Sequence, residues 1–196
     1  MYTAYKFHKG RDGFYSFIFN DIMGFERITN KGVNVEDVKL AMKGHVPDGY
    51  KFDPEVQFQD DDDDDYNSCP TLDDRVHVLV CVIPADNVSL MSPEVVTKMR
   101  EVREAASEMG IPQLAILTKV DKAYSQLTKD IKKVYNHKDL KQKVDELSML
   151  IGMPPNCFFL VKNYHSETNT NEDIDVLIRS TLREIINAGE DFLNNL

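Results

Sequence analysis

The sequence predicts an α/β fold in three layers: a mostly parallel sheet with helices on both faces, led by a β-hairpin. Three nearly all-apolar runs, residues 76–83, 114–117 and 157–161, are typical of strands buried on both faces of a parallel sheet. Helical patterns separate these runs, and strand–helix alternation joins parallel strands by right-handed crossovers. Two aromatic-rich runs at the N-terminus flank turn residues, which indicates the hairpin.

Local sequence signals support the first elements. The hairpin strands cover residues 2–7 and 14–20, around an Asp-Gly turn that tolerates positive φ angles. A short helix follows over residues 35–43, because Asn34 is a good N-cap and Gly44 ends the apolar periodicity. We expect the hairpin to add one antiparallel edge to the sheet.

The later helices alternate with the apolar strands. Residues 92–110 begin with Ser-Pro-Glu, a strong helix start, and end at a glycine. Two further helical patterns cover residues 123–135 and 139–151, and the last helix covers residues 171–193. The order of elements predicts one domain over residues 1–196.

A long segment, residues 45–71, has no periodic pattern and contains six consecutive aspartates, Asp60 to Asp65. Its length and composition predict an exposed, acidic, irregular loop. The run lacks the glycine and the ligand spacing of an EF-hand loop, so it is not a predicted calcium site.

Composition narrows the class of protein. The chain has 33 acidic and 23 basic residues and a net charge of -10, which argues against a nucleic-acid partner. The three cysteines are widely spaced, as in a protein of a reducing compartment. No run approaches the ~20 apolar residues of a membrane span. These features predict a soluble, cytoplasmic protein.

Candidate ligand residues follow the strands, because ligands of open α/β sheets bind beyond the carboxyl ends of the strands. Asp21 and Gly24 follow the second hairpin strand. A carboxylate there can hold the water shell of Mg²⁺, and the glycine lets a backbone amide approach a γ-phosphate. A simple strand-to-loop turn is the alternative interpretation of this D-x-x-G pattern.

Thr118-Lys119-Val120-Asp121 is a more specific pattern at the end of an apolar strand. A lysine stem can lie along a purine ring, and a carboxylate two residues later can accept two hydrogen bonds from the guanine edge. The alternative is that Asp121 caps a helix. With D-x-x-G expected at the same sheet edge, we favour guanine recognition. Lys162 and Asn163, after the last strand, occupy the place of a loop that supports the base.

The phosphate side of such a site is incomplete in this sequence. No GxxxxGK(S/T) phosphate-binding loop occurs among the 196 residues. We therefore expect no catalytic residues, weak or lost binding of GTP, GDP and Mg²⁺, and at most indirect metal contact by Asp21 through water.

Five segments resemble the interferon-induced protein 44 and 44-like family. They are FIFNDIMG, KGHVPDGY, LTKVD, MPPNCFFLVKNY and IINAGEDF, spread over nearly the whole chain. The resemblance implies a P-loop GTPase-like domain, cytoplasmic and linked to the interferon-induced antiviral immune response. It also implies that Asp21 and Gly24 match the magnesium and γ-phosphate motif, and that Lys119 and Asp121 match the guanine motif.

Departures from the family pattern leave two functions open. The first strand, the P-loop and the first helix are absent, so the chain is expected to be truncated at its N-terminus and its central sheet edges unpaired. Thr118 stands where many GTPases have Asn, and Phe25 where many have a water-orienting Gln. The chain is thus expected to be an incomplete GTP-binding domain. The alternative is a non-enzymatic scaffold acting through protein partners, self-association included.

Overall fold

The computed structural model describes residues 1–10, 13–22, 24, 33–53, 56–58 and 66–196. Its strands form two separate sheets: β1 and β2 form an antiparallel hairpin, and β3, β4 and β5 form a parallel sheet in that order. The strands are β1 (Thr3–His8), β2 (Phe14–Asp21), β3 (Leu79–Pro84), β4 (Gln113–Thr118) and β5 (Phe158–Leu160). The α/β class is confirmed.

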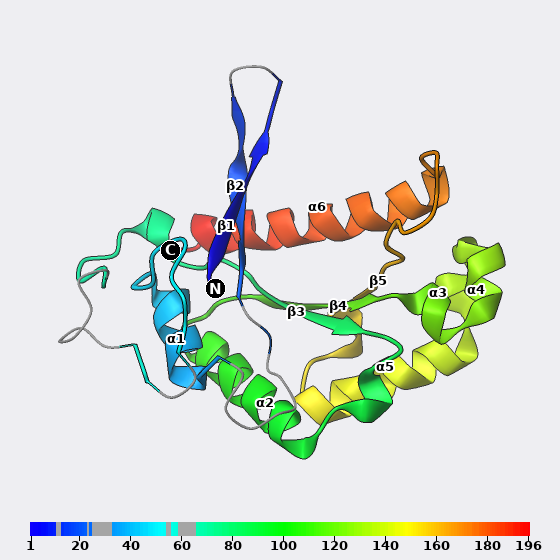
Figure 1. Ribbon diagram of the computed structural model, residues 1–196, viewed down its shortest axis with the longest axis horizontal. Coiled ribbons are helices and arrows are strands. Elements are labelled where there is room, and N and C mark those ends of the chain that lie inside the picture. The colour runs from blue at the N-terminus through cyan, green and yellow to red at the C-terminus, as the bar shows by residue number, and fades with distance from the viewer. Residues whose placement is uncertain (11–12, 23, 25–32, 54–55, 59–65) are drawn as a thin grey trace.

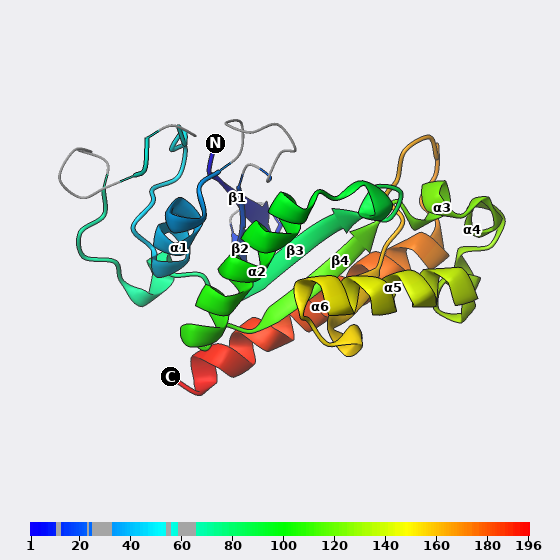
Figure 2. The ribbon, with the colours of Figure 1, turned by 90° about the horizontal axis from the view of Figure 1, so that it is seen from below.

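Helices cover both faces of the parallel sheet. Figure 1 shows α6 on one side of β3 and β4, and α2 and α5 on the other. Figure 2 shows α2 and α5 packed along the strands from below. The α-helices are α1 (Val35–Lys43), α2 (Pro93–Glu108), α3 (Val120–Ala123), α4 (Ser125–Lys129), α5 (Lys138–Ile151) and α6 (Glu172–Asn194). Short 3-10 helices cover Leu72–Asp74, Val88–Leu90, Ile131–Asn136 and Pro155–Cys157.

The helix starts follow the predicted capping chemistry. The Asn34 side chain accepts a hydrogen bond from the backbone N–H of Glu36, and Ser92 Oγ accepts one from Val95. Gly44, at φ 88°, ends α1 in the left-handed conformation that glycine adopts without steric cost. These local signals therefore place the helices α1 and α2.

Two predicted elements differ from the structure. The helical pattern over residues 123–135 is broken into α3, α4 and a 3-10 helix, with non-helical backbone at Tyr124 and Asp130. The hairpin does not extend the parallel sheet, because no strand among the described residues lies between β2 and β3. Figure 1 shows it projecting away from the body on the side of α6.

Two apolar cores stabilise the molecule. The first lies between the parallel sheet and its helices and includes Leu117, Leu147 and Ile174. The second joins α1 to the start of the chain, to α2 and to the segment after α1. Val46 and Phe58 of that segment are buried in it, so the prediction of an exposed loop over residues 45–71 is wrong for these residues. Asp60 to Asp65 lie outside the described residues.

A buried carboxylate lies in the second core. Asp37, in α1, is fully buried, and its Oδ1 accepts a hydrogen bond from the backbone N–H of Phe58 at 3.0 Å. Its Oδ2 has no hydrogen-bond partner within the part of the chain that is described. Burial is the main cause that raises the pKa of Asp37 above its ordinary value. Asp37 thus anchors the irregular segment to α1.

Candidate functional site

The carboxyl ends of the three parallel strands meet at one edge of the sheet. Pro84 pairs with Thr118, and the N–H of Ala85 donates to the Thr118 carbonyl at 2.8 Å. On the other side of β4, the N–H of Val161 donates to the Leu117 carbonyl at 2.8 Å. The segments that follow β3, β4 and β5 therefore leave the sheet side by side, as predicted for a ligand site.

Lys119 has an unusual backbone at this edge. Its φ is 56°, and it is the single non-glycine residue with a positive φ among the described residues. This conformation costs a residue with a Cβ about 1–2 kcal/mol, and such strain is concentrated at functional sites. Two backbone hydrogen bonds stabilise this turn, because the Lys119 carbonyl accepts from the N–H groups of Lys122 and Ala123.

Asp121 lies in the first turn of α3, next to this strained position. Its carbonyl accepts a hydrogen bond from the Thr128 hydroxyl at 3.3 Å. Lys119 is exposed and Asp121 half-buried. Within the described ranges, neither the Lys119 amine nor the Asp121 carboxylate has a hydrogen bond or an ion pair. Both side chains are thus available to a ligand at the carboxyl edge.

Lys162 is engaged by another residue. The residue is buried, with 8% exposed, and its amine forms an ion pair with Glu167 at 2.7 Å. The Glu167 carboxylate also accepts hydrogen bonds from the N–H groups of His165 and Ser166. These contacts, the His165 N–H first, lower the pKa of Glu167 to about 2. Sequence reasoning missed Glu167, because no motif marks a carboxylate that folds back on its own loop.

The rest of the loop after β5 is tied to the start of α6. The Tyr164 hydroxyl accepts a hydrogen bond from the Asn171 N–H and donates one to Asp175 Oδ1, both at 2.7 Å. Asn171 Oδ1 in turn accepts from the N–H groups of Asp173 and Ile174 and caps the helix. Asn163 is exposed. Hydrogen bonds therefore join the predicted base-supporting loop to the start of α6.

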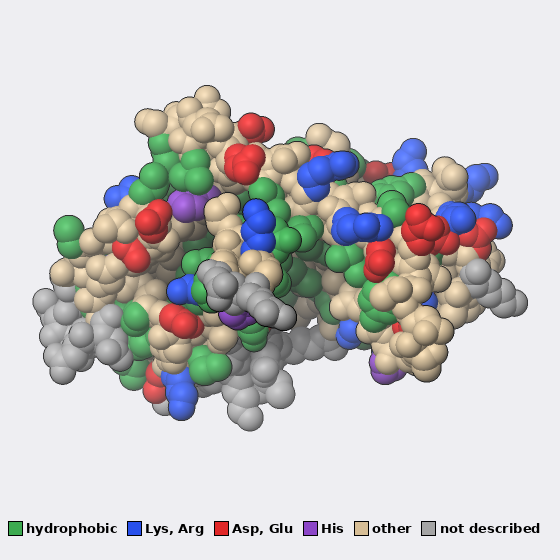
Figure 3. Space-filling model, turned by 90° about the horizontal axis from the view of Figure 1, so that it is seen from above, with side chains coloured by type: hydrophobic (Ala, Val, Ile, Leu, Met, Phe, Trp, Pro, Cys, Tyr) green, Lys and Arg blue, Asp and Glu red, His purple; other side chains and the backbone are tan. Residues whose placement is uncertain are grey.

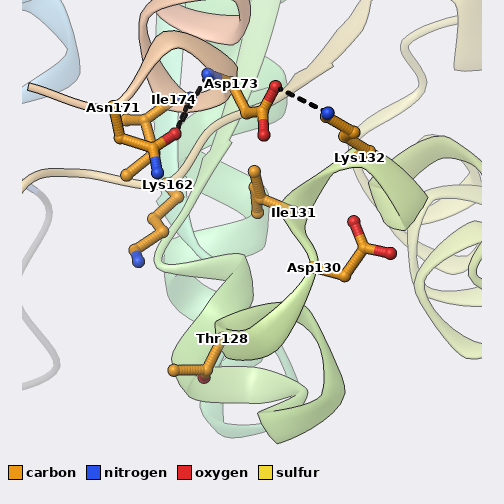
Figure 4. Close-up of a pocket in the computed structure, with 8 residues that line it drawn as sticks. All are labelled: Thr128, Asp130, Ile131, Lys132, Lys162, Asn171, Asp173 and Ile174. Atoms are coloured by element: carbon orange, nitrogen blue, oxygen red, sulfur yellow. Dashed lines mark hydrogen bonds and ion pairs between the residues drawn. The ribbon is translucent and has the colours of Figure 1, made fainter.

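A cavity of about 280 Å³ lies beside this loop, and Figure 4 shows its lining. Lys162 and Asn171 reach it from the loop, and an ion pair between Lys132 and Asp173 at 3.4 Å lies at its rim. The other lining residues are Thr128, Asp130, Ile131 and Ile174. Of the residues predicted to contact a guanine nucleotide, only Lys162 lines the cavity, so this hollow is not the predicted base site itself.

The predicted phosphate-side residues lie on the other sheet. Asp21 is the last residue of β2, opposite Thr3 of β1, and is exposed. Gly24 is exposed, and a Cβ added there would meet none of the described residues within 4 Å. Because the hairpin is separate from the parallel sheet, the expectation that Asp21 and Asp121 share one sheet edge is wrong for the described residues. Phe25 lies outside those residues.

Within the residues that the structure describes, no group of three or more His, Cys, Asp and Glu side chains is placed to hold a metal ion. In the same part of the chain, no helix has both the length and the apolar character that a bilayer crossing requires.

Burial raises the pKa of the Cys81 thiol to about 11, which makes it a poor nucleophile.

Comparisons with known proteins place the chain among its relatives. No protein-family model and no solved structure matches it. It is 32% identical to mouse interferon-induced protein 44 over 92% of this chain, and 29% identical to the human protein of that name over 100%. It is 26% identical to human interferon-induced protein 44-like over 100% of this chain. The chain spans 42–44% of the length of these relatives. The chain belongs to the family of interferon-induced protein 44 and 44-like.

Proposed function

We propose that this chain is a GTPase-like domain of an interferon-response protein that keeps the guanine-recognising edge of a nucleotide site. The observation that carries the proposal is the strained Lys119 at the carboxyl end of β4, followed two residues later by Asp121, whose carboxylate has no partner among the described residues. Two adjacent donors on the guanine edge match such a carboxylate, and adenine offers no such pair. The names of the relatives support the link to the interferon response. In this proposal the protein acts in the cytoplasm, as part of the antiviral response.

We further propose that these 196 residues bind GTP weakly and do not hydrolyse it. A phosphate loop supplies several backbone amides and a lysine, and each charge-assisted hydrogen bond contributes ~1.5–3 kcal/mol. The absence of three such bonds costs roughly 4–9 kcal/mol, or about three to six decades of affinity. Lys119 and Asp121 would contact only the base and do not compensate. Binding of hydrated Mg²⁺ by Asp21 would be weak, because no phosphate oxygens are present as further ligands.

A scaffold that binds protein partners is the second candidate function. The ion pair of Lys162 with Glu167 favours it, because it engages one of the residues predicted to support a base. Asp21 ends a strand of the hairpin sheet, whereas Asp121 follows β4 of the parallel sheet, and this separation favours the scaffold as well. In this alternative the fold is retained and the carboxyl edge has no nucleotide.

Titration with fluorescent GDP, in Mg²⁺ buffer, separates the two functions. We expect saturable binding with a dissociation constant above ~10 μM, displaced by guanosine but not by adenosine. Asp121→Ala should abolish that displacement, whereas Asp86→Ala, at the end of β3, is the matched control. A dissociation constant below ~10 μM would overturn the weak-binding proposal, and equal displacement by guanosine and adenosine would overturn guanine recognition. No detectable binding would leave the scaffold function as the better account.

A further inference from the structure

The hairpin exposes an aromatic face that the proposed nucleotide site does not use. The register pairs Tyr5 with Phe19, so side chains at odd positions of both strands point to one face. Phe17 lies at the centre of this face, with its ring 5.3 Å from Phe7 and 5.6 Å from Phe19. The Tyr15 ring lies 5.7 Å from Phe17. The rings of Phe7, Tyr15, Phe17 and Phe19 form a continuous row along the hairpin, and Tyr5 lies opposite Phe19.

This face is large for a surface exposed to water. Tyr5 and Tyr15 are about half exposed, and Phe7 and Phe19 more than a third. Since a buried aromatic side chain covers about 150–250 Å², these four rings together leave a few hundred Å² uncovered. Phe14 and Ile18 expose further apolar surface on the opposite face. Figure 3 views the side toward which the hairpin projects and shows apolar side chains gathered in a hollow of that face. Patches of this size on a monomer are often functional.

The two edges of the hairpin differ. Among the described residues, β1 and β2 pair only with each other, so each has a free edge. β1 carries Lys6, and an edge lysine discourages pairing with another chain. β2 reads FYSFIFND, with no lysine, proline or glycine, and its one charge is the terminal Asp21. The edge of β2 is therefore the one open to an added strand.

We infer that β2 pairs antiparallel with β2 of a second copy of this chain, with the two-fold axis at Phe17. In this register Tyr15 lies opposite Phe19 of the second copy, and Phe17 opposite Phe17 of the second copy. Aromatic pairs directly opposite one another stabilise a sheet. The two aromatic faces join into one face of a four-stranded sheet, and the two β1 strands with Lys6 become its outer edges.

Charge at the ends of the paired strands favours the second copy as the occupant. The same register places Asp21 opposite Gly13 of the second copy. Across the hairpin from Gly13 lies Lys9, whose N–H donates to the Gly13 carbonyl at 2.7 Å. The Lys9 amine lies 5.8 Å from the centre of the Tyr15 ring, on the aromatic face where Asp21 also points. Each Asp21 thus meets a lysine of the other copy, and no like charges face each other along β2.

Sedimentation velocity over protein concentrations up to ~100 μM tests this interface, since that range detects micromolar dissociation constants. The chain is expected to form a dimer. Phe17→Lys places two like charges opposite each other on the axis and should weaken the dimer at least ~10-fold. Val176→Lys makes the same type of change at an exposed apolar residue of α6 and should leave the dimer intact.

A mixing experiment separates the interface from a folding defect. Phe17→Glu alone should weaken the dimer in the same way as Phe17→Lys, whereas an equimolar mixture of the two variants should form a heterodimer. Monomeric wild-type chain at ~100 μM would overturn the proposal. So would a Phe17→Lys variant that dimerises like the wild type, or a mixture that stays monomeric while both variants keep the circular dichroism spectrum of the wild type.

Discussion

Lys162 and Glu167 form an ion pair of 2.7 Å that closes the loop after β5 onto itself. The lysine would otherwise be a buried charge without a partner, which proteins rarely tolerate. The carboxylate in turn organises the backbone, because it accepts the N–H groups of His165 and Ser166. This pair therefore sets the shape of the carboxyl edge at β5, next to the cavity that Lys162 lines.

Glu167→Gln should destabilise the protein near neutral pH, because it leaves the Lys162 charge buried without an opposite charge. In the folded protein the pKa of Glu167 is lowered to about 2, from an ordinary value of 4.5. The stability from the ionised carboxylate is thus fully present above pH 4.5 and is lost as the pH falls toward 2. Urea denaturation at pH 7 should show a lower midpoint for the variant, and the difference should shrink at pH 3.

Glu190→Gln is the matched control for that measurement. Glu190 is exposed on α6 and forms no ion pair within the described part of the chain. The urea midpoint of the Glu190→Gln variant should equal that of the wild type at both pH values. A Glu167→Gln midpoint that equals the wild type at pH 7 would mean that the ion pair contributes nothing to stability.

Asp121→Asn should change base preference from guanine to xanthine. The carboxylate accepts two hydrogen bonds from guanine, whereas an amide can also donate one to the extra carbonyl of xanthine. Parallel titrations with fluorescent GDP and its xanthosine analogue would measure the ratio of the two dissociation constants, which should shift by ~10-fold or more in favour of xanthine, about 1.4 kcal/mol. Thr128→Val, which removes the hydroxyl bonded to the Asp121 carbonyl, should weaken both ligands equally. An unchanged ratio for Asp121→Asn would refute the guanine assignment.

Local signals predicted much of the fold. The three apolar runs contain the strands β3, β4 and β5 or most of their residues, and Asn34, Ser92 and Gly44 mark helix ends as predicted. The sequence could not show that the hairpin forms its own sheet, because strand pairing depends on which strands lie beside it in space.

The candidate site was predicted less completely than the fold. Thr118 to Asp121 and Lys162 reach one sheet edge, since the parallel register carries them there. The strain at Lys119 and the partner of Lys162 both arise from packing and leave no pattern in the sequence. Asp37 lies in the first turn of α1, and only the buried segment around Phe58 makes it part of the core, which no local pattern indicates.

Asp37→Asn should be neutral or stabilising by ~1 kcal/mol at pH 7, because it removes a buried charge and keeps the acceptor for the Phe58 N–H. The pKa of Asp37 is raised by burial above its ordinary value of 3.8, so folding favours the protonated carboxyl. The cost of ionisation therefore grows as the pH rises from about 4 through the raised pKa. The free energy of unfolding of Asp37→Asn should accordingly rise relative to that of the wild type as the pH rises.

Asp37→Ala is the comparison that isolates the hydrogen bond. It leaves the buried Phe58 N–H without an acceptor, which costs ~1–3 kcal/mol relative to Asp37→Asn. Equal stabilities of the two variants by urea denaturation would show that this bond does not anchor the segment after α1.

Gly44 and Gly49 form a matched pair of glycines, with φ angles of 88° and 86°. A side chain at either position is strained by ~1–2 kcal/mol in this conformation. At Gly49 a Cβ would meet nothing within 4 Å, whereas at Gly44 it would lie 2.8 Å from the Asp74 carbonyl oxygen. Because that neighbour is backbone, relief requires Asp74 and its 3-10 helix to move away from the end of α1.

Gly44→Ala should therefore destabilise the protein by ~1–3 kcal/mol more than Gly49→Ala, the typical cost of overpacking a close contact. Thermal melts of both variants, read by circular dichroism, would measure the difference, and ~1 kcal/mol corresponds to about 2–4 °C in a chain of this size. Equal melting temperatures would mean that backbone conformation alone demands glycine at position 44. A much lower value for Gly44→Ala would show that the close approach of the Asp74 backbone also requires glycine at this position.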